Sequence, residues 1–321
     1  MSQIDQQHIL HWGLSHKSTP LNLRERFVVD PSCFLEKTCR LLHKHDLLEL
    51  LIFQTCHRFE MFFIPKARKY NNLGPHLVQD LIHHDHHDLS DCCQSFQGRD
   101  AVDYLFRVVA SLDSMLIGET QVTSQFKKAV VLADQAQTLG PVLRRLSDIA
   151  LRTAKEIRHQ TDLSKGKVSL AHCALDLAKT IYQDISSCHV GIIGAGTMAS
   201  QCFDYAITQG AREVSVFNRH QERASVLVRS HDQANPYSLH QLLPSLPDLD
   251  ILISCAQADH YFISKRDGED VLGLRRAAGK QYFFICDMAL PRSIDPKLSQ
   301  VSEVYLFDVD DIKSSQDIGY Q

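Results

Sequence analysis

Residues 189–200 read His189-Val190-Gly191-Ile192-Ile193-Gly194-Ala195-Gly196-Thr197-Met198-Ala199-Ser200. The pattern predicts an apolar strand, a GxGxxA turn and the start of a helix. Gly194 suits the tight turn, Gly196 lets backbone approach a pyrophosphate, and the small Ala199 lets the helix pack closely on its strand. The helix N-terminus would hold the anion. We therefore predict a dinucleotide site that includes Gly194, Ala195, Gly196, Thr197, Met198 and Ala199.

The next strand, predicted over 214–217, determines which dinucleotide fits. Enzymes that use NAD place Asp or Glu at its end, about 20 residues after the turn, to bind the ribose hydroxyls. This chain has Asn218-Arg219 there, and Arg223 follows one helical turn later. An acid would repel a 2′-phosphate, whereas an arginine fork binds it. These three residues predict NADP(H) as the cofactor.

Short apolar runs at 249–253, 282–286 and 304–307 predict further strands, with helices or loops between them. This alternation is typical of a doubly wound parallel sheet of the Rossmann type. The polar segment from Cys286 to Arg292 is expected at the carboxyl edge of that sheet, where such folds bind ligands.

The first half of the chain predicts a separate α/β domain. Short apolar runs predict strands at 9–14 and 50–53. Helices are predicted from Pro31, with Asp30 as N-cap, from about His76, and over 100–109, 119–137 and 141–160. We expect one domain at 1–160 and an NADP-binding Rossmann domain at 161–310.

Composition narrows the class of protein. The chain has 321 residues, 44% hydrophobic and 22% charged, with a net charge of −4. It is expected to fold, and no apolar stretch approaches the roughly 20 residues that span a bilayer. The N-terminus lacks a signal-peptide pattern, which makes the cytoplasm the default location. Ten scattered cysteines argue against a disulfide framework or a structural zinc site. The histidine cluster at 83–87 is more typical of a solvated loop than of a metal site.

Gln54-Thr55-Cys56-His57-Arg58-Phe59-Glu60 follows the predicted strand at 50–53. We expect the strand end to deliver Cys56 to a loop. A thiol acts as a nucleophile in its thiolate form, and Arg58 and His57 are neighbours that lower a thiol pKa. The alternative is a buried structural cysteine. A nucleophilic thiol and an NADP site together imply two stages, thioester formation followed by reduction to an aldehyde.

Long motifs follow one another along the chain: GLSHKSTP at 13–20, LRER at 23–26, QTCHRFE at 54–60, SLDSMLIGETQV at 111–122, GAGTMA at 194–199, NR at 218–219 and DMALPRSIDP at 287–296. Over roughly residues 9–312 they resemble, in order, the glutamyl-tRNA reductase family. The resemblance implies NADPH-dependent reduction of glutamyl-tRNA(Glu) to glutamate-1-semialdehyde, with release of tRNA. This reaction begins the five-carbon route to tetrapyrroles.

The resemblance also implies that 1–160 is the catalytic, substrate-recognition domain and that 311–321 is the stub of a C-terminal linker helix. It further implies roles at matching positions. Cys56 would take the glutamyl group from the tRNA ester. Arg58 suits the side-chain carboxylate of the substrate, and Glu119 suits its α-ammonium. The residues implied to bind substrate are Thr55, His57, Arg58, Ser114, Glu119, Thr120, Gln121 and Gln125. No metal ligand is implied.

Three features depart from the family pattern. His57 replaces an asparagine and is titratable. Tyr104 stands where the family has a histidine implicated in activity, and it can support catalysis as a hydrogen-bond donor. The family's C-terminal dimerisation domain would follow a segment like 305–311, but about ten residues follow it here, so the family homodimer is not assumed.

Other functions stay open at this point. A non-catalytic relative that binds tRNA or a partner is one alternative. An NADP oxidoreductase like shikimate dehydrogenase is another, and it would need no reactive cysteine. The unstable aldehyde product also suggests handover to the next enzyme, glutamate-1-semialdehyde aminomutase.

Overall fold

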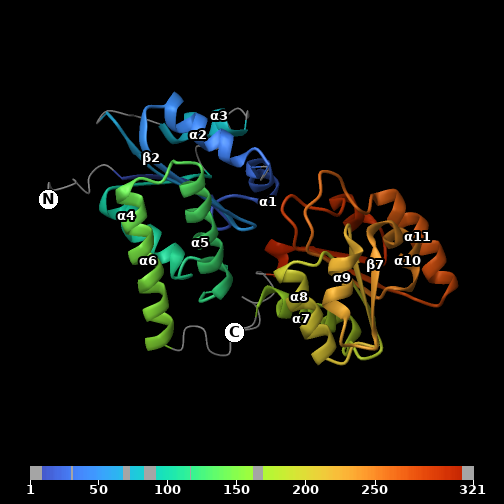
Figure 1. Cartoon of the computed structure of the whole chain (residues 1–321). Helices are drawn as coiled ribbons and strands as arrows, with labels where there is room; N and C mark the ends of the chain where they lie inside the picture. The colour runs from blue at the N-terminus through green and yellow to red at the C-terminus, as the bar shows by residue number, and fades with distance from the viewer. Residues whose placement is uncertain are drawn as a thin grey trace. The chain divides into compact units, whose positions relative to one another are not determined.

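The computed structural model describes residues 9–29, 32–67, 73–82, 92–115, 117–161 and 169–312. The chain divides into two compact units, Met1–Lys167 and Val168–Gln321 (Figure 1). Asp30, Pro31, the histidine cluster at 83–87 and the end of the chain from 313 lie outside the described residues. The helix predicted from Pro31 begins instead at Phe34 with Cys33 as its N-cap, because residues 32 and 33 form a turn before it, so the prediction of Asp30 as N-cap is wrong. Within the described ranges, no helix is long and apolar enough to cross a membrane.

The first unit is built on a four-stranded antiparallel sheet with the order β2-β3-β1-β4. Its strands are β1 (Leu10–Ser15), β2 (Leu47–Thr55), β3 (Arg58–Pro65) and β4 (Gln94–Gln97). The strands predicted at 9–14 and 50–53 correspond to β1 and β2. The sequence analysis did not anticipate β3 or β4, and β2 is longer than predicted.

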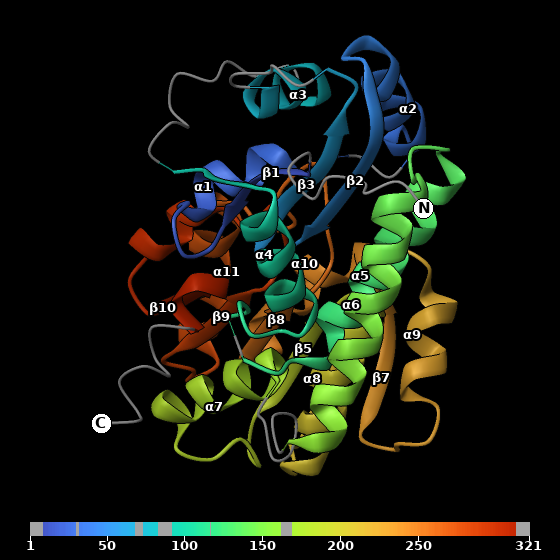
Figure 2. The same cartoon turned by 90° about the vertical axis from the view of Figure 1, so that its left-hand side faces the viewer.

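Successive side chains of each strand point to opposite faces of this sheet. Because both faces carry apolar side chains, helices cover both of them. Leu50 and Ile52 of β2 face a core shared with α2 (Phe34–Lys44) and α3 (Leu73–Ile82). Leu51 and Phe53 face the other core, shared with α4 (Arg99–Val109), α5 (Thr120–Gln135) and α6 (Pro141–Gln160). Figure 2 shows α2 and α3 apart from α5 and α6 across β2 and β3. The short helix α1 (Leu21–Arg24) follows β1.

Two local features explain where α5 and α6 run. The ring of Phe126 on α5 lies 5.4 Å from that of Phe53, and the Leu50 N–H donates to the carbonyl of Thr138 just beyond α5. Therefore α5 runs antiparallel to β2, and its N-terminus lies toward the strand end that precedes Cys56. The helix α6 begins at Pro141 as predicted, and the buried Glu49 carboxylate accepts from the N–H groups of its first turn.

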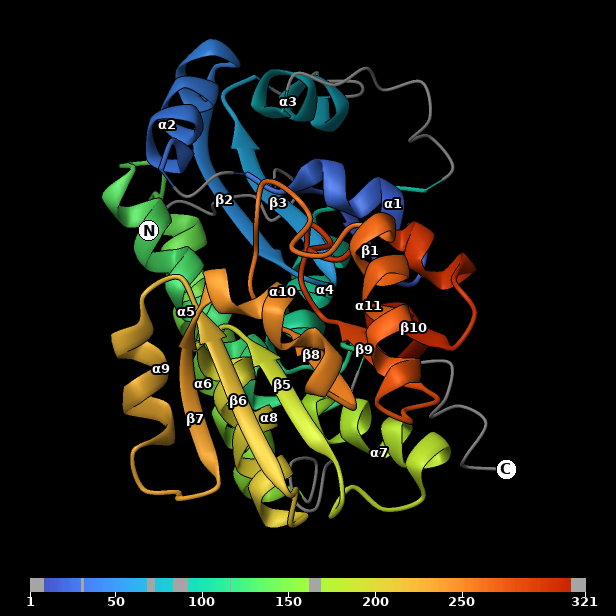
Figure 3. The same ribbon diagram turned by 90° about the vertical axis from the view of Figure 1, so that its right-hand side faces the viewer.

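The second unit is a six-stranded parallel sheet with the order β10-β9-β8-β5-β6-β7. Its strands are β5 (His189–Ile193), β6 (Glu213–Asn218), β7 (Ala234–Ser238), β8 (Ile251–Ser254), β9 (Phe283–Asp287) and β10 (Val304–Asp308). Figure 3 shows β5, β6 and β7 side by side and pointing the same way. The predicted fold class, an α/β domain followed by a doubly wound parallel sheet, is confirmed. The chain reverses its direction of winding between β5 and β8, which is where such sheets bind ligands.

Helices flank the second sheet on both sides, as parallel strands require. Figure 1 shows α7 (Leu170–Tyr182) and α8 (Thr197–Thr208) on one side, and α10 (Leu242–Ser245) and α11 (Lys265–Ala277) on the other. The remaining helix, α9 (Gln221–Val228), packs against β6 and β7. Leu242 and Leu272 close the α10–α11 side over Phe217 and Phe283.

Candidate active site

Cys56 lies in a two-residue loop directly after β2. Thr55 pairs with Arg58, so β2 and β3 form a hairpin whose two loop residues are Cys56 and His57. The His57 N–H donates to Thr55 Oγ1 at 3.1 Å, and Arg24 Nη1 donates to the Cys56 carbonyl at 2.8 Å. These contacts hold the thiol at the tip of a rigid hairpin.

His57 is the immediate partner of the Cys56 thiol. The Cys56 Sγ lies 3.3 Å from His57 Nδ1. Burial, and then the charges of His16, Arg24 and Arg58, lower the pKa of His57 well below its usual 6.5. The imidazole is therefore neutral at pH 7 and does not lower the pKa of the thiol through a positive charge. A neutral imidazole at this distance can instead accept the thiol proton.

Arg58 is buried in a network of charged groups. Its Nη1 donates to Glu60 Oε1 at 3.1 Å, and its Nη2 donates to the carbonyl and carboxylate of Asp113. Burial alone would lower the pKa of Arg58, but Glu60, Tyr104 and Asp113 outweigh that effect and raise it. Lys17 also pairs with Asp113. The guanidinium is therefore a fixed cation, reached most easily on the side of Asp113, whose side chain is 17% exposed.

Tyr104 belongs to the same network. Its hydroxyl donates to Glu60 Oε1 at 2.8 Å and lies 3.4 Å from Arg58 Nη1. Burial and the charge of Glu60 raise the pKa of Tyr104 far above its usual value. The phenol therefore stays protonated and acts as a donor rather than as a base.

The loop before α5 contributes Ser114 and Glu119. Ser114 is buried, and its hydroxyl has no hydrogen-bond partner among the described residues. Burial raises the pKa of Glu119 from 4.5 to about 7. Gln121 and Gln125 are half-buried in the first turns of α5, whose N-terminus lies toward the hairpin end of β2. The side chain of Thr120 is outside the described part of the chain.

In the second unit, the turn after β5 has the features expected of a dinucleotide site. Gly194 has a φ of +113°, a conformation that favours glycine, and a Cβ there would lie 3.4 Å from Ala256 Cβ after β8. Gly196 is the N-cap of α8, its side-chain position is open, and no side chain caps the helix. Ala199, in the first turn of α8, is fully buried. The residues present fit a pyrophosphate at this helix N-terminus.

The end of β6 carries the residues that predicted NADP(H). Asn218 is half-buried and donates through Nδ2 to the His220 carbonyl at 2.8 Å. Arg219 and Arg223 are exposed, and neither forms an ion pair with a described residue. Two cations therefore stand beyond the end of this strand, where a 2′-phosphate would need them.

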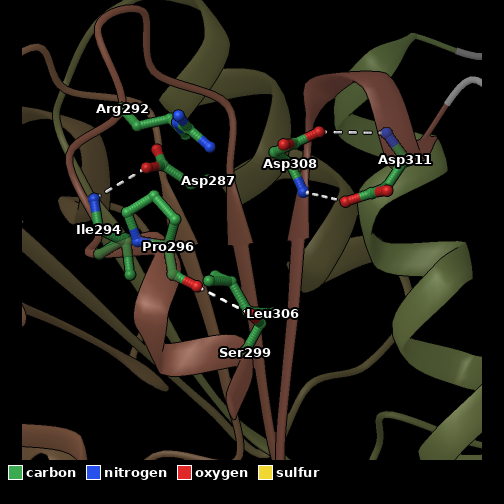
Figure 4. Close-up of a pocket in the computed structure, with 8 residues that line it drawn as sticks. All are labelled: Asp287, Arg292, Ile294, Pro296, Ser299, Leu306, Asp308 and Asp311. Carbon is green, nitrogen blue, oxygen red and sulfur yellow. Dashed lines mark hydrogen bonds between the residues drawn. The ribbon is translucent and has the colours of Figure 1, made fainter. Parts of the chain in front are cut away.

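A second polar feature lies at the carboxyl ends of β9 and β10. A cavity of about 170 Å³ lies there, and Asp287, Arg292, Asp308 and neighbouring residues line it. Figure 4 shows these side chains. The Asp287 carboxylate accepts from the N–H groups of Ala289, Ser293 and Ile294. Burial raises the pKa of Asp287 to about 6 in spite of these bonds. Asp287 thus fixes the loop at this edge of the sheet.

Sequence reasoning missed three members of the first unit's network. Glu60 and Asp113 stood inside quoted motifs but received no role, and His11 was not considered at all. The only signal for Glu60 was its place at the head of the apolar run 61–64, which could have indicated β3. Nothing in the local sequence connects His11 to a site 49 positions away.

Comparisons with known proteins agree with this division of the chain. Residues 12–161 match the model of the glutamyl-tRNAGlu reductase N-terminal domain, and residues 176–315 match that of shikimate / quinate 5-dehydrogenase. A glutamyl-tRNA reductase of Citrifermentans bemidjiense is 35% identical over 94% of this chain and 68% of its own length. Those of Geobacter sulfurreducens and Bacillus subtilis are 36% and 33% identical, over 94% and 95% of this chain and 69% and 67% of their own lengths.

Proposed function

The chain belongs to the glutamyl-tRNA reductase family, and from that premise we propose that it reduces the glutamyl ester of tRNA(Glu) to glutamate-1-semialdehyde through a thioester on Cys56. The family makes the chain an oxidoreductase of tetrapyrrole synthesis. The observation that carries the proposal is the Cys56 thiol, held at a hairpin tip 3.3 Å from a neutral imidazole.

We propose that His57 moves the proton in the first step. Its Nδ1 takes the proton of the Cys56 thiol as Sγ attacks the ester carbonyl carbon. The new C–S bond replaces the C–O bond to the terminal ribose of the tRNA. The ribose oxygen leaves with the proton that His57 returns. One thioester and one free tRNA result.

The substrate's charged ends would meet the two polar sides of the site. Its side-chain carboxylate would bind Arg58 on the Asp113 side, because Glu60 covers the other side of the guanidinium. Its α-ammonium would bind Glu119 and would favour the ionised form of that carboxyl. The unpartnered hydroxyl of Ser114 offers a further hydrogen bond. We assign Thr55, Thr120, Gln121 and Gln125 to the same pocket.

The second unit supports a nicotinamide cofactor, and we propose that it is NADPH. The turn at 194–199 would hold the pyrophosphate, and Asn218, Arg219 and Arg223 would hold the 2′-phosphate. When bound, the cofactor supplies the hydride that converts the thioester carbonyl to an aldehyde. Cys56 leaves as the thiolate, and His57 shields it until a proton returns from solvent.

Domain roles and partners complete the proposal. Residues 1–160 would carry the catalytic cysteine and 161–310 the cofactor. The substrate is a charged tRNA by family, and handover of the aldehyde to an aminomutase is a proposal from the instability of that product. The two alternatives, a non-catalytic relative and a shikimate-dehydrogenase-like enzyme, are not favoured because a matching N-terminal reductase domain accompanies the dehydrogenase-like one.

A single-turnover assay with charged tRNA tests the mechanism. Without NADPH, a glutamyl thioester should accumulate on Cys56; with NADPH, it should decay to the semialdehyde. The substitution Cys56→Ser should abolish both signals, whereas Cys39→Ser on the outer helix α2 should preserve them. Semialdehyde formation by the Cys56→Ser protein would show that the mechanism is wrong.

A further inference from the structure

His11 lies behind the Arg58 network, on β1. Its imidazole Nε2 is 2.7 Å from Glu60 Oε2, and neither side chain is more than 1% exposed. Gly13 faces Glu60 across the two strands, and a Cβ at Gly13 would lie 1.8 Å from Glu60 Oε2. The missing side chain at Gly13 therefore opens the path by which the Glu60 carboxylate reaches over β1 to His11.

The same carboxylate is the anchor for Arg58. While Oε2 binds His11, Oε1 accepts from Tyr104 at 2.8 Å and from Arg58 Nη1 at 3.1 Å. A carboxylate bound on both oxygens is held in one orientation, so the contact with His11 sets the direction of the Arg58 guanidinium together with the bonds to Asp113.

The position of His11 is itself fixed by packing. Its ring centroid lies 4.6 Å from that of Tyr104, 4.9 Å from that of Phe62 and 5.4 Å from that of Phe96. Its Nδ1 has no hydrogen-bond partner among the described residues. The tautomer with the proton on Nε2 therefore satisfies Glu60 and leaves no buried N–H without an acceptor.

We infer that His11 is a specificity-determining positioning residue, which, through Glu60, aims the Arg58 guanidinium so that the site accepts a glutamyl group and rejects the uncharged glutaminyl group of the same shape. The inference rests on the proposed function, in which Arg58 binds the substrate carboxylate. His11 touches no reacting atom. Its effect is confined to the geometry of the carboxylate site.

Discrimination of this kind depends on direction. A bidentate pair between guanidinium and carboxylate needs both N–H groups in the plane of the two oxygens. A neutral amide gains little from the same alignment because one of its two ends is a donor. Loss of alignment should therefore lower the rate with glutamate much more than the rate with glutamine.

The test uses one tRNA charged with either glutamate or glutamine, because the tRNA contribution then cancels in the ratio of the two kcat/KM values. We expect His11→Leu to lower this ratio on the order of tenfold, less than the roughly hundredfold cost of a 1 Å misplacement of reacting groups. We expect His11→Gln, whose amide N–H can reach Glu60, to restore most of the ratio. If the leucine variant does not fold, His11→Asn, which is too short to reach Glu60, takes its place.

Three comparisons separate the possible outcomes. His189→Leu removes a buried imidazole that contacts Ser215 at 2.7 Å in the second unit, and it should leave the ratio unchanged. Arg58→Gln should lower the ratio at least as much as His11→Leu; if it does not, the assignment of Arg58 under the proposed function fails. The inference about His11 is wrong if Arg58→Gln lowers the ratio but His11→Leu leaves it unchanged. His11→Leu leaves the ratio unchanged also when it lowers the rates with glutamate and glutamine by the same factor. If the wild-type protein does not turn over, the ratio of the dissociation constants of the two charged tRNAs is compared between the same variants instead.

Discussion

The dinucleotide turn of the second unit and the charge network of the first unit present polar groups in different ways. The turn is one contiguous stretch, 193–199, that offers backbone N–H groups at an exposed helix N-terminus. The network joins side chains of β1, the turn after it, β3, α4 and the loop before α5. Its exposed pair, Lys17 and Asp113, is 96 positions apart, and the rest is buried. A site made of backbone depends on local conformation, whereas a site made of buried charges depends on the whole domain.

The substitution with the largest expected effect is Glu60→Gln. It removes the anion that binds Arg58, Tyr104 and His11, and it leaves a buried cation with less compensation. Breaking such a pair costs about 3–5 kcal/mol. Because Trp12 is the one tryptophan of the chain and is buried in the first unit, its fluorescence during urea unfolding measures the loss.

The exposed pair of Arg99 and Asp103 provides the control for Glu60→Gln. Its charges are 3.9 Å apart on the outside of α4. Asp103→Asn should change the free energy of unfolding by no more than about 0.5 kcal/mol. Equal losses for the two variants would mean that burial does not distinguish the network from the surface.

Two glycine substitutions, one beside the buried charge network and one in the dinucleotide turn, should have different effects on stability and on cofactor binding. Gly13→Ala would drive a methyl group into Glu60 and should destabilise the first unit by up to about 3 kcal/mol, as an overpacked core does. Gly196→Ala meets no atom within 4 Å and should leave stability unchanged. It should instead weaken NADPH binding by about tenfold, or 1.4 kcal/mol, because the methyl group keeps the pyrophosphate from the backbone. Trp12 fluorescence and NADPH fluorescence titrations measure the two effects. A stable Gly13→Ala protein would contradict the close approach.

The pH dependence of stability should reveal Glu119. Its carboxyl keeps its proton up to about pH 7 in the folded protein, whereas the unfolded chain releases it near pH 4.5. The folded state therefore holds more protons in this interval, and the free energy of unfolding falls as the pH rises through it. We expect a fall of about 3 kcal/mol from this group, which Glu119→Gln should remove. If the free energy of unfolding changes with pH in the same way for the wild-type protein and for Glu119→Gln, the pKa of Glu119 is not raised in the folded protein.

The smallest expected effect concerns the exposed arginines of the second unit. Replacing Arg219 and Arg223 by alanine should reduce the preference for NADPH over NADH on the order of tenfold, because charge-assisted bonds to the 2′-phosphate are lost. Arg212→Ala, at the opposite end of β6, should leave the preference unchanged. Ratios of kcat/KM for the two cofactors measure the change, and an unaltered preference would refute the assignment of the 2′-phosphate site.

Local patterns predicted five of the six strands described in the second unit and the longer helices of the first, but not β7 or α7. Pro141 marked the start of α6 correctly, and the short apolar runs located β5, β6, β8, β9 and β10, each within about two residues. The same patterns missed β3, because Arg58 and Glu60 do not look like buried strand residues. Charged side chains enter a core only with partners, and their partners lie far away in the sequence.

The sequence alone determined the parallel dinucleotide fold and predicted Cys56 as nucleophile and NADP(H) as cofactor, because each depends on residue types at short, fixed spacing. Only the tertiary structure decided that His57 is neutral, that Arg58 is held by Glu60 and Asp113, and that His11 reaches them through the space above Gly13. Protonation states and buried ion pairs depend on desolvation and on distant partners. These arise only when the sheet and its helices pack together.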